Sequence, residues 1–249
     1  METAWRRRID PDTDGSGTKE EVPAQGWQQD PRSCRVQVGF SAEWSDVYAR
    51  GEQIVRWPWS DLISACKRHL PALAGMRVIE LGCGTGPNIR FFEAEGADYY
   101  GVDGSAEAVK TCARANVCVG DFTRRLPELP ALDMICDRAA VTHNDTGSIR
   151  RCLDLCHDAL KPGGFYIGID WFSSAHWAFK HGTSVDEFTR SHIAEGQFKG
   201  VGLVHFSDSP HLMDLFRKFE IVDLSHKVIT SCNSADRVFA SWNIVARKK

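Results

Sequence analysis

The sequence lacks the features of a membrane protein and of an exported protein. Although 43% of its 249 residues are hydrophobic, no run approaches the ~18 consecutive apolar residues that span a bilayer. The basic triplet at residues 6–8 is followed by Ile9-Asp10-Pro11-Asp12 in place of the apolar core of an export signal. We therefore expect a cytoplasmic protein.

An excess of charge of one sign is also missing. The chain has 30 Lys and Arg residues against 33 Asp and Glu residues, and its net charge is −3. Such a balance provides neither the basic surface of a nucleic-acid-binding protein nor that of a protein attracted to lipid headgroups. We expect neither nucleic acid nor membrane among its partners.

A metal-binding pattern is absent as well, although cysteine is common. The nine cysteines are an odd number, which indicates free thiols. Cys152 and Cys156 stand four residues apart beside His157, but no second ligand pair has a suitable spacing. The two thiols share a helical spacing with Ile149 and Leu153, so we expect them to face a core and expect no metal.

The composition divides the chain into three parts. Residues 1–32 are rich in Asp, Gly, Pro, Gln and Glu, and we expect a disordered leader because they offer little apolar surface to bury. Residues 33–76 end in a predicted helix with Ser60 as its N-cap, and we expect them to form a helical lid segment. Residues 77–249 are expected to form the main domain, with an aromatic insertion on the substrate side at 172–211.

Strands and helices alternate along the main domain. Strands are predicted at 77–81, 99–102, 117–119 and 133–136, and a fifth follows the turn at 161–164. Helices are predicted at 88–95, at 106–115 and up to residue 160, and a last one precedes two strand-like segments at 220–224 and 238–246. This order predicts an α/β fold with a doubly wound, mostly parallel sheet of seven strands and a C-terminal antiparallel hairpin.

Three alternating glycines join the first strand of this domain to the helix after it. The stretch reads VIELGCGTGPNIRFF at 78–92, and its glycines are Gly82, Gly84 and Gly86. In open α/β sheets, ligands bind beyond the carboxyl ends of the strands, which is where this turn stands. Glycine lets a ligand approach the backbone without meeting a Cβ, and the following helix offers unpaired N–H groups. The turn therefore predicts a ligand-binding site.

The spacing of the glycines and two nearby acidic residues limit the classes of ligand that this turn could bind. G-x-G-x-G followed by Pro87 lacks the last glycine of the dinucleotide-binding fingerprint. Glu80 stands two residues before the first glycine, and Asp103 closes the second predicted strand. A carboxylate in the position of Asp103 can accept hydrogen bonds from both hydroxyls of a ribose.

Taken together, these motifs resemble the class I S-adenosylmethionine-dependent methyltransferases. The matching stretches are VIELGCGTG at 78–86, GVDGS at 101–105, GDF at 120–122 and LKPGG at 160–164. The stretches NIRFFEAEGADYYGVDGS at 88–105, DRAAVTHND at 137–145 and IDWFS at 169–173 also resemble a bacterial small-molecule branch of that family. The resemblance implies a Rossmann-like fold, S-adenosyl-L-methionine as cofactor and S-adenosyl-L-homocysteine as product. It also implies a transferase that methylates a small molecule.

The resemblance further implies roles for individual residues. The three glycines border the methionine and ribose of the cofactor, and Glu80 beneath them orients its amino group. Asp103 holds the ribose hydroxyls, with a mere helix cap as the alternative. Asp121 accepts from the adenine amine and Phe122 flanks the ring, unless Phe122 belongs only to the core. The other residues expected at the cofactor site are Cys83, Asn88, Gly104, Ser105, Gly120, Asp137 and Arg138.

Candidate catalytic bases follow the fourth and fifth predicted strands or lie in the insertion. His143 is the first candidate, because a reference His pKa of ~6.5 suits proton transfer near neutrality. A histidine that only caps a helix or faces solvent is the alternative. Asp170 ends the fifth strand and would face the cleft, or would only anchor a loop, and His205 is the third candidate or a surface residue.

Aromatic side chains are concentrated before the first strand and again after the fifth. They are too many for a connector, so we expect them to cover the cofactor and line an acceptor pocket, with a place in the sheet-edge core as the alternative. Arg50 or Arg56 would meet an anionic group of the acceptor. The residues expected in this pocket are Trp44, Tyr48, Arg50, Trp57, Trp171 and Phe172.

We therefore expect a methyltransferase that acts on an oxygen or a nitrogen of a small metabolite, for example an aminosugar or a secondary metabolite, as a monomer or homodimer. A nucleotide-dependent oxidoreductase would share the sheet and the acidic ribose ligand, but the missing glycine and Glu80 argue against it. A non-catalytic module that keeps only the cofactor fold is the other alternative.

Overall fold

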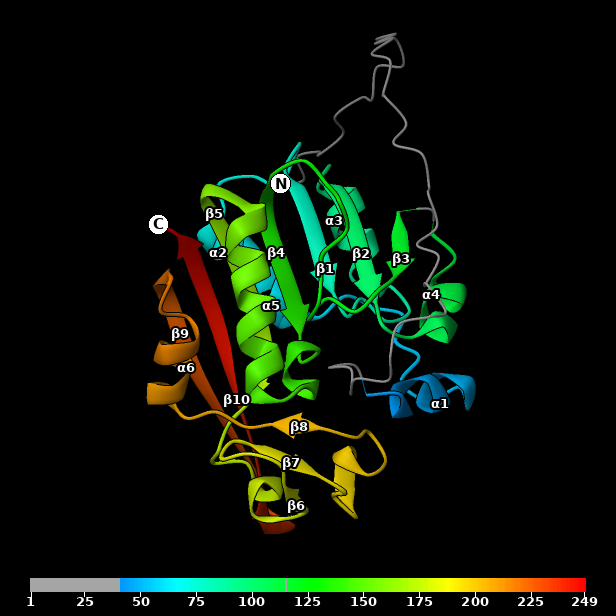
Figure 1. The fold of residues 1–249 in the computed structure, drawn as a ribbon, viewed down its shortest axis with the longest axis vertical. Coiled ribbons are helices and arrows are strands. Elements are labelled where there is room, and N and C mark those ends of the chain that lie inside the picture. The colour runs from blue at the N-terminus through cyan, green and yellow to red at the C-terminus, as the bar shows by residue number, and fades with distance from the viewer. Residues whose placement is uncertain (1–40, 115) are drawn as a thin grey trace, which may run out of the picture.

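Seven strands form the central sheet, in the order β3-β2-β1-β4-β5-β10-β9 (Figure 1). The computed structural model describes residues 41–114 and 116–249, so the predicted leader at 1–32 lies outside the described residues. The strands are β1 (Arg77–Leu81), β2 (Asp98–Asp103), β3 (Val117–Val119), β4 (Leu132–Arg138), β5 (Leu160–Phe172), β9 (Phe219–Ser231) and β10 (Ser234–Lys248). The first five run parallel, while β10 is antiparallel to β5 and to β9. The predicted sheet, including its terminal hairpin, is confirmed.

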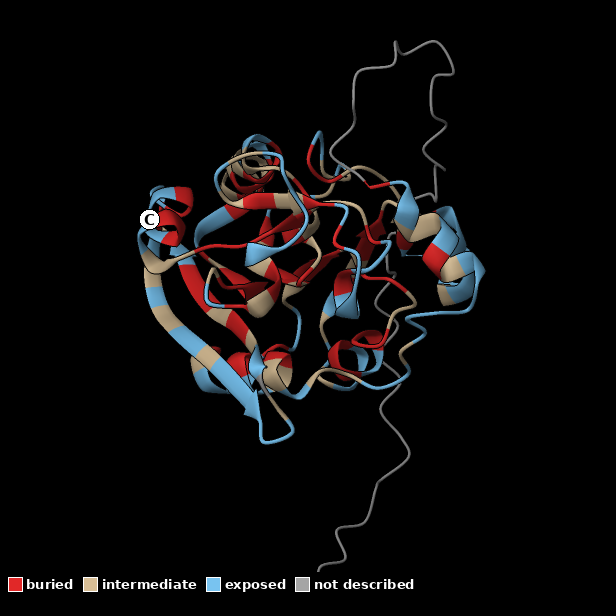
Figure 2. Cartoon of the chain, turned by 90° about the horizontal axis from the view of Figure 1, so that it is seen from below, coloured by how far each residue is buried: buried red, intermediate tan, exposed pale blue. Residues whose placement is uncertain are grey.

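Helices cover both faces of this sheet. In Figure 1, α5 (Thr146–Ala159) lies in front of the sheet, and α2 (Ser60–His69) and α3 (Ile89–Ala94) lie behind it. Successive residues of β1 point to opposite faces, so Val78 packs in the core with α2 and α3, while Ile79 packs in the core with α5. Buried residues gather where these layers meet (Figure 2).

The helix α5 buries the stripe that its sequence predicts. Cys152 and Cys156 are fully buried in the core beneath this helix, together with Ile149 and Leu153. Asp145 caps its N-terminus by accepting from the backbone N–H of Ser148 at 2.8 Å. The prediction that the two thiols face a core is confirmed.

One helix and the two strands of the terminal hairpin differ clearly from their predicted bounds. The helix α4 (Ala106–Cys112) ends earlier than predicted, because Ala113 adopts a left-handed conformation with φ 51°. The hairpin strands β9 and β10 extend well beyond the predicted segments and carry the hairpin past the parallel strands (Figure 1). Both faces of the hairpin end are largely exposed, so its residues are mostly polar. The alternation of apolar and polar residues that predicts a strand is therefore missing there.

The insertion after β5 builds a cap at the carboxyl ends of the strands. It contains a small antiparallel sheet and two short 3₁₀ helices: β6 (Thr183–Ser184), β7 (Thr189–Ser191), β8 (Val204–His205), η2 (Trp177–Lys180) and η3 (Gly196–Phe198). Its own core includes Phe172, Phe198 and Phe206. The helix α6 (Ser209–Leu215) leads from the cap back to β9, and α1 (Glu43–Ala49) lies beside the cap in Figure 1.

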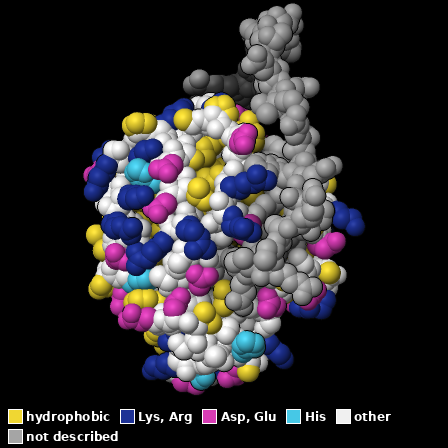
Figure 3. All heavy atoms as spheres, in the orientation of Figure 1, with side chains coloured by type: hydrophobic (Ala, Val, Ile, Leu, Met, Phe, Trp, Pro, Cys, Tyr) yellow, Lys and Arg dark blue, Asp and Glu magenta, His cyan; other side chains and the backbone are white. Residues whose placement is uncertain are grey.

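Acidic and basic side chains are intermingled on the face drawn in Figure 3. On the α5 side of the sheet, Lys218 pairs with Asp154 at 2.7 Å, and Arg150 pairs with Asp214 of α6. In the part of the chain that the structure describes, no helix has both the length and the apolar character needed to cross a membrane.

Candidate functional site

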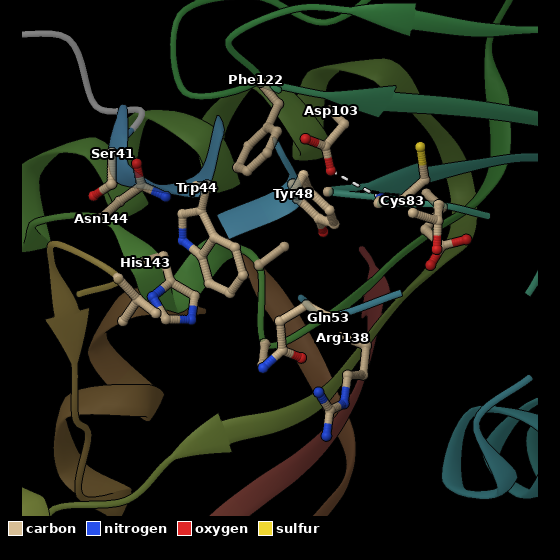
Figure 4. A pocket seen from close by; sticks show the side chains of 18 of the residues that line it. Ser41, Trp44, Tyr48, Gln53, Cys83, Asp103, Phe122, Arg138, His143 and Asn144 are labelled. Carbon is tan, nitrogen blue, oxygen red and sulfur yellow. Dashed lines mark hydrogen bonds between the residues drawn. The ribbon is translucent and has the colours of Figure 1, made fainter. Parts of the chain in front are cut away.

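A cavity of about 310 Å³ lies beyond the carboxyl ends of β1, β2 and β4. The strand order reverses here, since β2 and β4 flank β1 on opposite sides, and ligands of open α/β sheets bind at such a point. The volume falls within the ~300–1,000 Å³ typical of small-molecule sites. The cavity has a glycine end, with Gly82, Gly84 and Asp103, and a histidine end, with Trp44, His143, Asn144 and Phe172 (Figure 4).

The glycine turn after β1 holds its backbone against other parts of the protein. Gly82 and Gly84 adopt φ angles of 64° and 54°, which favour glycine. A Cβ at Gly82 would overlap the Cβ of Ala140, and a Cβ at Gly84 would lie 2.8 Å from the hydroxyl oxygen of Tyr48. The turn therefore fits closely between Ala140, the N-cap of η1 (Val141–His143), and α1 because Gly82 and Gly84 have no side chain.

Asp103 is bound to two backbone groups at the glycine end. Its Oδ2 accepts from the N–H of Gly84 at 2.8 Å, and its Oδ1 accepts from the N–H of Ser105 at 2.8 Å. Burial raises the pKa of this carboxyl, and the two N–H groups oppose that rise. Because Ser105 itself is the N-cap of α4, the alternative of Asp103 as a helix cap does not hold. Each carboxylate oxygen keeps a lone pair for a further donor.

Glu80 lies beneath the turn and lines the cavity floor. Its Oε1 accepts from Nδ2 of Asn88 at 2.7 Å, and its Oε2 accepts from the hydroxyl of Tyr99 at 2.7 Å. Burial raises the pKa of Glu80 to about 7 in spite of these two donors. Asn88 in turn accepts from the backbone N–H of Trp59 at 3.0 Å, which links the floor to the start of α2.

Asp121 presents a buried acceptor without a partner. Its Oδ1 accepts from the N–H and the hydroxyl of Thr123, at 2.9 and 2.6 Å, whereas Oδ2 has no hydrogen-bond partner among the described residues. Phe122 beside it is largely buried and lines the same cavity. A buried acceptor next to an aromatic ring fits a flat ligand that carries an N–H donor.

His143 is fixed at the opposite end. Its Nδ1 lies 2.9 Å from the carbonyl oxygen of Leu203, and because a carbonyl only accepts, Nδ1 carries the hydrogen. Trp44 and Phe172 pack edge-on against the ring at centroid distances of 4.8 and 5.8 Å. Burial lowers the pKa of His143 to about 4, so the ring is neutral near pH 7 and its Nε2 is a hydrogen-bond acceptor.

The sequence from Val78 to Gly164 matches the family model described as a methyltransferase domain. This segment of the chain is therefore similar to a methyltransferase domain. The glycine end of the cavity fits S-adenosyl-L-methionine, since the glycine backbone, the carboxylate of Asp103 and Oδ2 of Asp121, which no described residue satisfies, lie together there.

Known methyltransferases share this fold. An uncharacterised methyltransferase of Synechocystis is 27% identical over 116 residues, which cover 45% of this chain and 54% of that protein. The chain therefore matches about half the length of this relative. A methyltransferase structure from Methanosarcina mazei is 18% identical with a TM-score of 0.61, covering 77% of this chain and 98% of that one.

A second structure, the 1,6-didemethyltoxoflavin-N1-methyltransferase of Burkholderia thailandensis, is 17% identical with a TM-score of 0.57. It covers 83% of this chain and 86% of that one, and it holds 1,6-didemethyltoxoflavin and S-adenosylhomocysteine. A third, a phosphoethanolamine-type N-methyltransferase of Haemonchus contortus, is 18% identical with a TM-score of 0.55 and covers 83% of this chain and 56% of that one. At these identities the likeness shows the fold.

Most residues predicted for the cofactor site of this chain line the cavity, and four do not. Those that line it are Glu80, Gly82, Cys83, Gly84, Asp103, Gly104, Gly120, Asp121, Phe122 and Arg138. Gly86, Asn88 and Ser105 lie behind the lining. The prediction for Asp137 is wrong, because its carboxylate is fully buried among the hydroxyl of Tyr166, the indole N–H of Trp171 and two backbone N–H groups. It supports the turn after β4.

Two of the three candidate bases are also placed elsewhere. Asp170 pairs with Arg138 at 3.0 Å and with Lys227 at 2.7 Å and accepts from the hydroxyl of Ser241, so it anchors strand ends and does not line the cavity. His205 is buried in the cap, where its two ring nitrogens contact Thr189 and His211 at 3.0 and 3.2 Å. The structure thus leaves His143 as the one candidate at the cavity, with a pKa lower than the ordinary value assumed for it.

The aromatic residues divide in the same way. Trp44, Tyr48 and Phe172 line the cavity as predicted. Trp171 does not, because its ring lies in the sheet core with Tyr166 and Phe216.

Two residues of the predicted lid segment likewise lie away from the cavity. Trp57 is 71% exposed, and Arg50 pairs with the neighbouring Glu52 on the surface. The pocket prediction is wrong for these two and for Trp171.

Several residues that line the cavity were not predicted from the sequence. They come from distant segments and belong to no motif: Ser41, Gln53, Gln197, Phe198, Val201 and Phe239. Gln53 has a φ of 57°, an unusual backbone conformation for a side-chain-bearing residue that sequence alone does not reveal. Phe239 lies in β10, where it reads as an ordinary strand residue.

Proposed function

We propose that this chain transfers a methyl group from S-adenosylmethionine to a small molecule bound at the histidine end of the cavity. The observation that carries the proposal is the continuity of the two ends within one cavity (Figure 4). The carboxylate of Asp103 stands at the glycine end, and His143 stands between two aromatic side chains at the other. A cavity of this kind suits two ligands that meet in its middle.

Four residues at the glycine end are proposed to hold the cofactor. The two oxygens of Asp103, each with a lone pair left, suit the two hydroxyls of a ribose. Oδ2 of Asp121 suits the exocyclic amine of adenine, and Phe122 flanks the ring. Glu80, held by Asn88 and Tyr99, places a carboxyl group beneath the turn, where an ammonium group would lie.

In methyl transfer, the main task of the protein is to place the acceptor atom in line with the methyl group. When bound, the cofactor supplies a methyl group that is already activated by a positively charged sulfur. Correct placement of two reactants can lower a barrier by ~7–11 kcal/mol, and exclusion of water favours the dispersal of charge. Trp44 and Tyr48 of α1 and Phe172 at the cap enclose the space, so we propose that residues 41–76 act as a lid and that the insertion at 172–211 forms the substrate side.

The acceptor is proposed to be a small metabolite methylated on oxygen or nitrogen. Two structural neighbours hold small molecules, 1,6-didemethyltoxoflavin in one and phosphomonomethylethanolamine in the other. His143 is the proposed catalytic residue, because its unprotonated Nε2 belongs to a ring that lines the cavity. The eight described cysteines are free thiols, which supports a reducing compartment such as the cytoplasm.

Calorimetry and a transfer assay test this proposal. The full-length chain should bind S-adenosylhomocysteine, and it should move a radiolabelled methyl group from S-adenosylmethionine into a metabolite extract of its source organism. Binding without transfer to any fraction of the extract would favour a non-catalytic module. No binding would remove the proposal altogether.

A further inference from the structure

Asn144 carries a buried acceptor that no described residue satisfies. The side chain is only 2% exposed, and its Nδ2 donates to the carbonyl oxygen of Val141 at 3.1 Å. That contact fixes the amide orientation, since the opposite one would place two oxygens against each other. Its Oδ1 then has no hydrogen-bond partner among the described residues, although the residue lines the cavity. Leaving a buried acceptor without a donor is unfavourable, so this oxygen points to a donor on a ligand.

His143 offers a second acceptor from the adjacent position in the chain. Nδ1 of His143 donates its hydrogen bond to the carbonyl oxygen of Leu203, and Trp44 and Phe172 pack against two sides of the ring. The unprotonated Nε2 can therefore accept a hydrogen bond from a ligand. Both residues belong to the same turn, because η1 ends at His143 and Asn144 is its C-cap. In Figure 4, the donor-bearing side chains of Gln53 and Arg138 lie on another side of the cavity, whereas those of Ser41 and Trp44 lie on the same side as His143 and Asn144.

Resting on the proposed function, we propose that the methyl acceptor is a neutral primary amino group that donates one hydrogen to His143 and the other to Asn144. Such a nitrogen keeps its lone pair free after both hydrogen bonds are made. A hydroxyl group has one hydrogen and would leave one of the two acceptors unmet, and a tertiary amine has none to give. The aromatic walls of Trp44, Phe172 and Phe198 select a flat, apolar body for the molecule that carries this group.

The transfer step balances with these residues alone. The nitrogen lone pair forms the new bond to the methyl carbon, the carbon–sulfur bond breaks, and its electron pair stays on sulfur. The nitrogen becomes positively charged. It keeps its two hydrogens, which remain hydrogen-bonded to Nε2 of His143 and Oδ1 of Asn144. The product gives one proton to solvent on leaving, so His143 orients the amine without storing a proton, in keeping with its low pKa.

The first test identifies the methylated atom. The full chain is incubated with methyl-deuterated S-adenosylmethionine and a metabolite extract, and the labelled product is isolated and its structure solved by mass spectrometry and NMR. A label on a nitrogen that carried two hydrogens in the parent compound supports the inference. A label on oxygen, carbon, sulfur or a secondary amine overturns it and leaves the methyltransferase function intact. Intact binding of S-adenosylhomocysteine without any labelled product overturns the proposed function itself.

The second test uses variants of the turn. Asn144→Leu removes the acceptor, and we expect kcat/KM for the identified amine to fall by about ten-fold or more, with S-adenosylhomocysteine affinity changed less than about three-fold. For the hydroxyl analogue of that amine, kcat/KM should change far less, so that the preference for the amine shrinks. The matched control is Thr142→Val, which alters a buried hydroxyl of the same turn that does not line the cavity. An unchanged preference in Asn144→Leu would overturn the role of Asn144.

Discussion

The carboxylate of Asp103 accepts a 2.8 Å hydrogen bond from the backbone N–H of Gly84, which ties the end of β2 to the middle of the glycine turn after β1. The polar groups that follow β1 and β2 thus lie next to one another at the cavity. The contact holds the turn in place and also aims the carboxylate, so a single residue has both a structural and a proposed ligand-binding role.

Loss of this carboxylate should weaken cofactor binding. We expect Asp103→Ala to raise the Kd for S-adenosylhomocysteine by at least about ten-fold, because two charge-assisted hydrogen bonds to the ribose disappear. Isothermal titration calorimetry measures the change. Asp98→Asn, at the exposed start of the same strand, is the matched control and should bind normally. Equal affinities of Asp103→Ala and the control would refute the ribose assignment.

A side chain at Gly84 should disturb the turn in two separable ways. In Gly84→Ala, a side chain is added to a backbone with a φ of 54°, in the left-handed region. The new Cβ would lie 2.8 Å from the hydroxyl oxygen of Tyr48. We expect a loss of about 1–3 kcal/mol in the free energy of unfolding, measured by urea denaturation. Adding Tyr48→Phe removes the crowded hydroxyl and should restore part of the loss. If the double variant is as unstable as the sum of the two single variants, the crowding at Tyr48 plays no part.

The buried carboxyl of Glu80 should make stability fall as the pH rises. Its pKa is raised to about 7 in the folded chain from an ordinary value of 4.5, so between these values the folded state holds a proton that the unfolded chain releases. The free energy of unfolding therefore decreases with rising pH in this window. Glu80→Gln cannot ionise, and we expect it to gain on the order of 1–3 kcal/mol relative to the wild type between pH 5 and pH 8. Parallel stability curves for the two proteins would contradict the raised pKa, and the exposed Glu128→Gln serves as control.

Asp170 should matter for stability and not as a base. Replacement by Asn removes the carboxylate that Arg138 and Lys227 share. Because both cations are partly exposed and Lys227 keeps its pair with Asp61 at 2.6 Å, we expect a loss of about 1–3 kcal/mol, below the range for a fully buried ion pair. Glu220→Gln breaks the exposed pair with Arg247 and should cost less than about 1 kcal/mol. Thermal unfolding compares the two. A variant Asp170→Asn of normal stability that has lost methyl transfer would return Asp170 to the list of catalytic candidates.

The glycine end of the cavity was predictable because its residues lie in short motifs that directly follow strands. A parallel sheet brings the ends of its strands to one edge, so residues as far apart as Glu80, Asp103 and Asp121 can be assigned to one place from the strand pattern alone. The same reasoning failed for Asp137 and Asp170. Both follow or end strands as expected, but each finds partners within the fold, and sequence does not show which partners a buried carboxylate will meet.

The histidine end was far less predictable, because it is assembled from segments that share no motif. Ser41 and Trp44 come from the chain before the domain, Phe198 from the cap and Phe239 from the last strand. Trp57 and Trp171 look as suitable as Trp44 in the sequence, yet one faces solvent and the other the sheet core.

By itself the sequence determined the order of the strands, the open glycine turn and the residues placed immediately after the strands, since these depend on local spacing and on the geometry common to all parallel sheets. Only the tertiary structure decided which polar side chains remained unpaired. Asn144 and Asp121 keep a free acceptor because no neighbour among the described residues donates to it. In contrast, Asp170 accepts from Ser241, far away in the chain, and His205 contacts Thr189 and His211 within the same part of the chain.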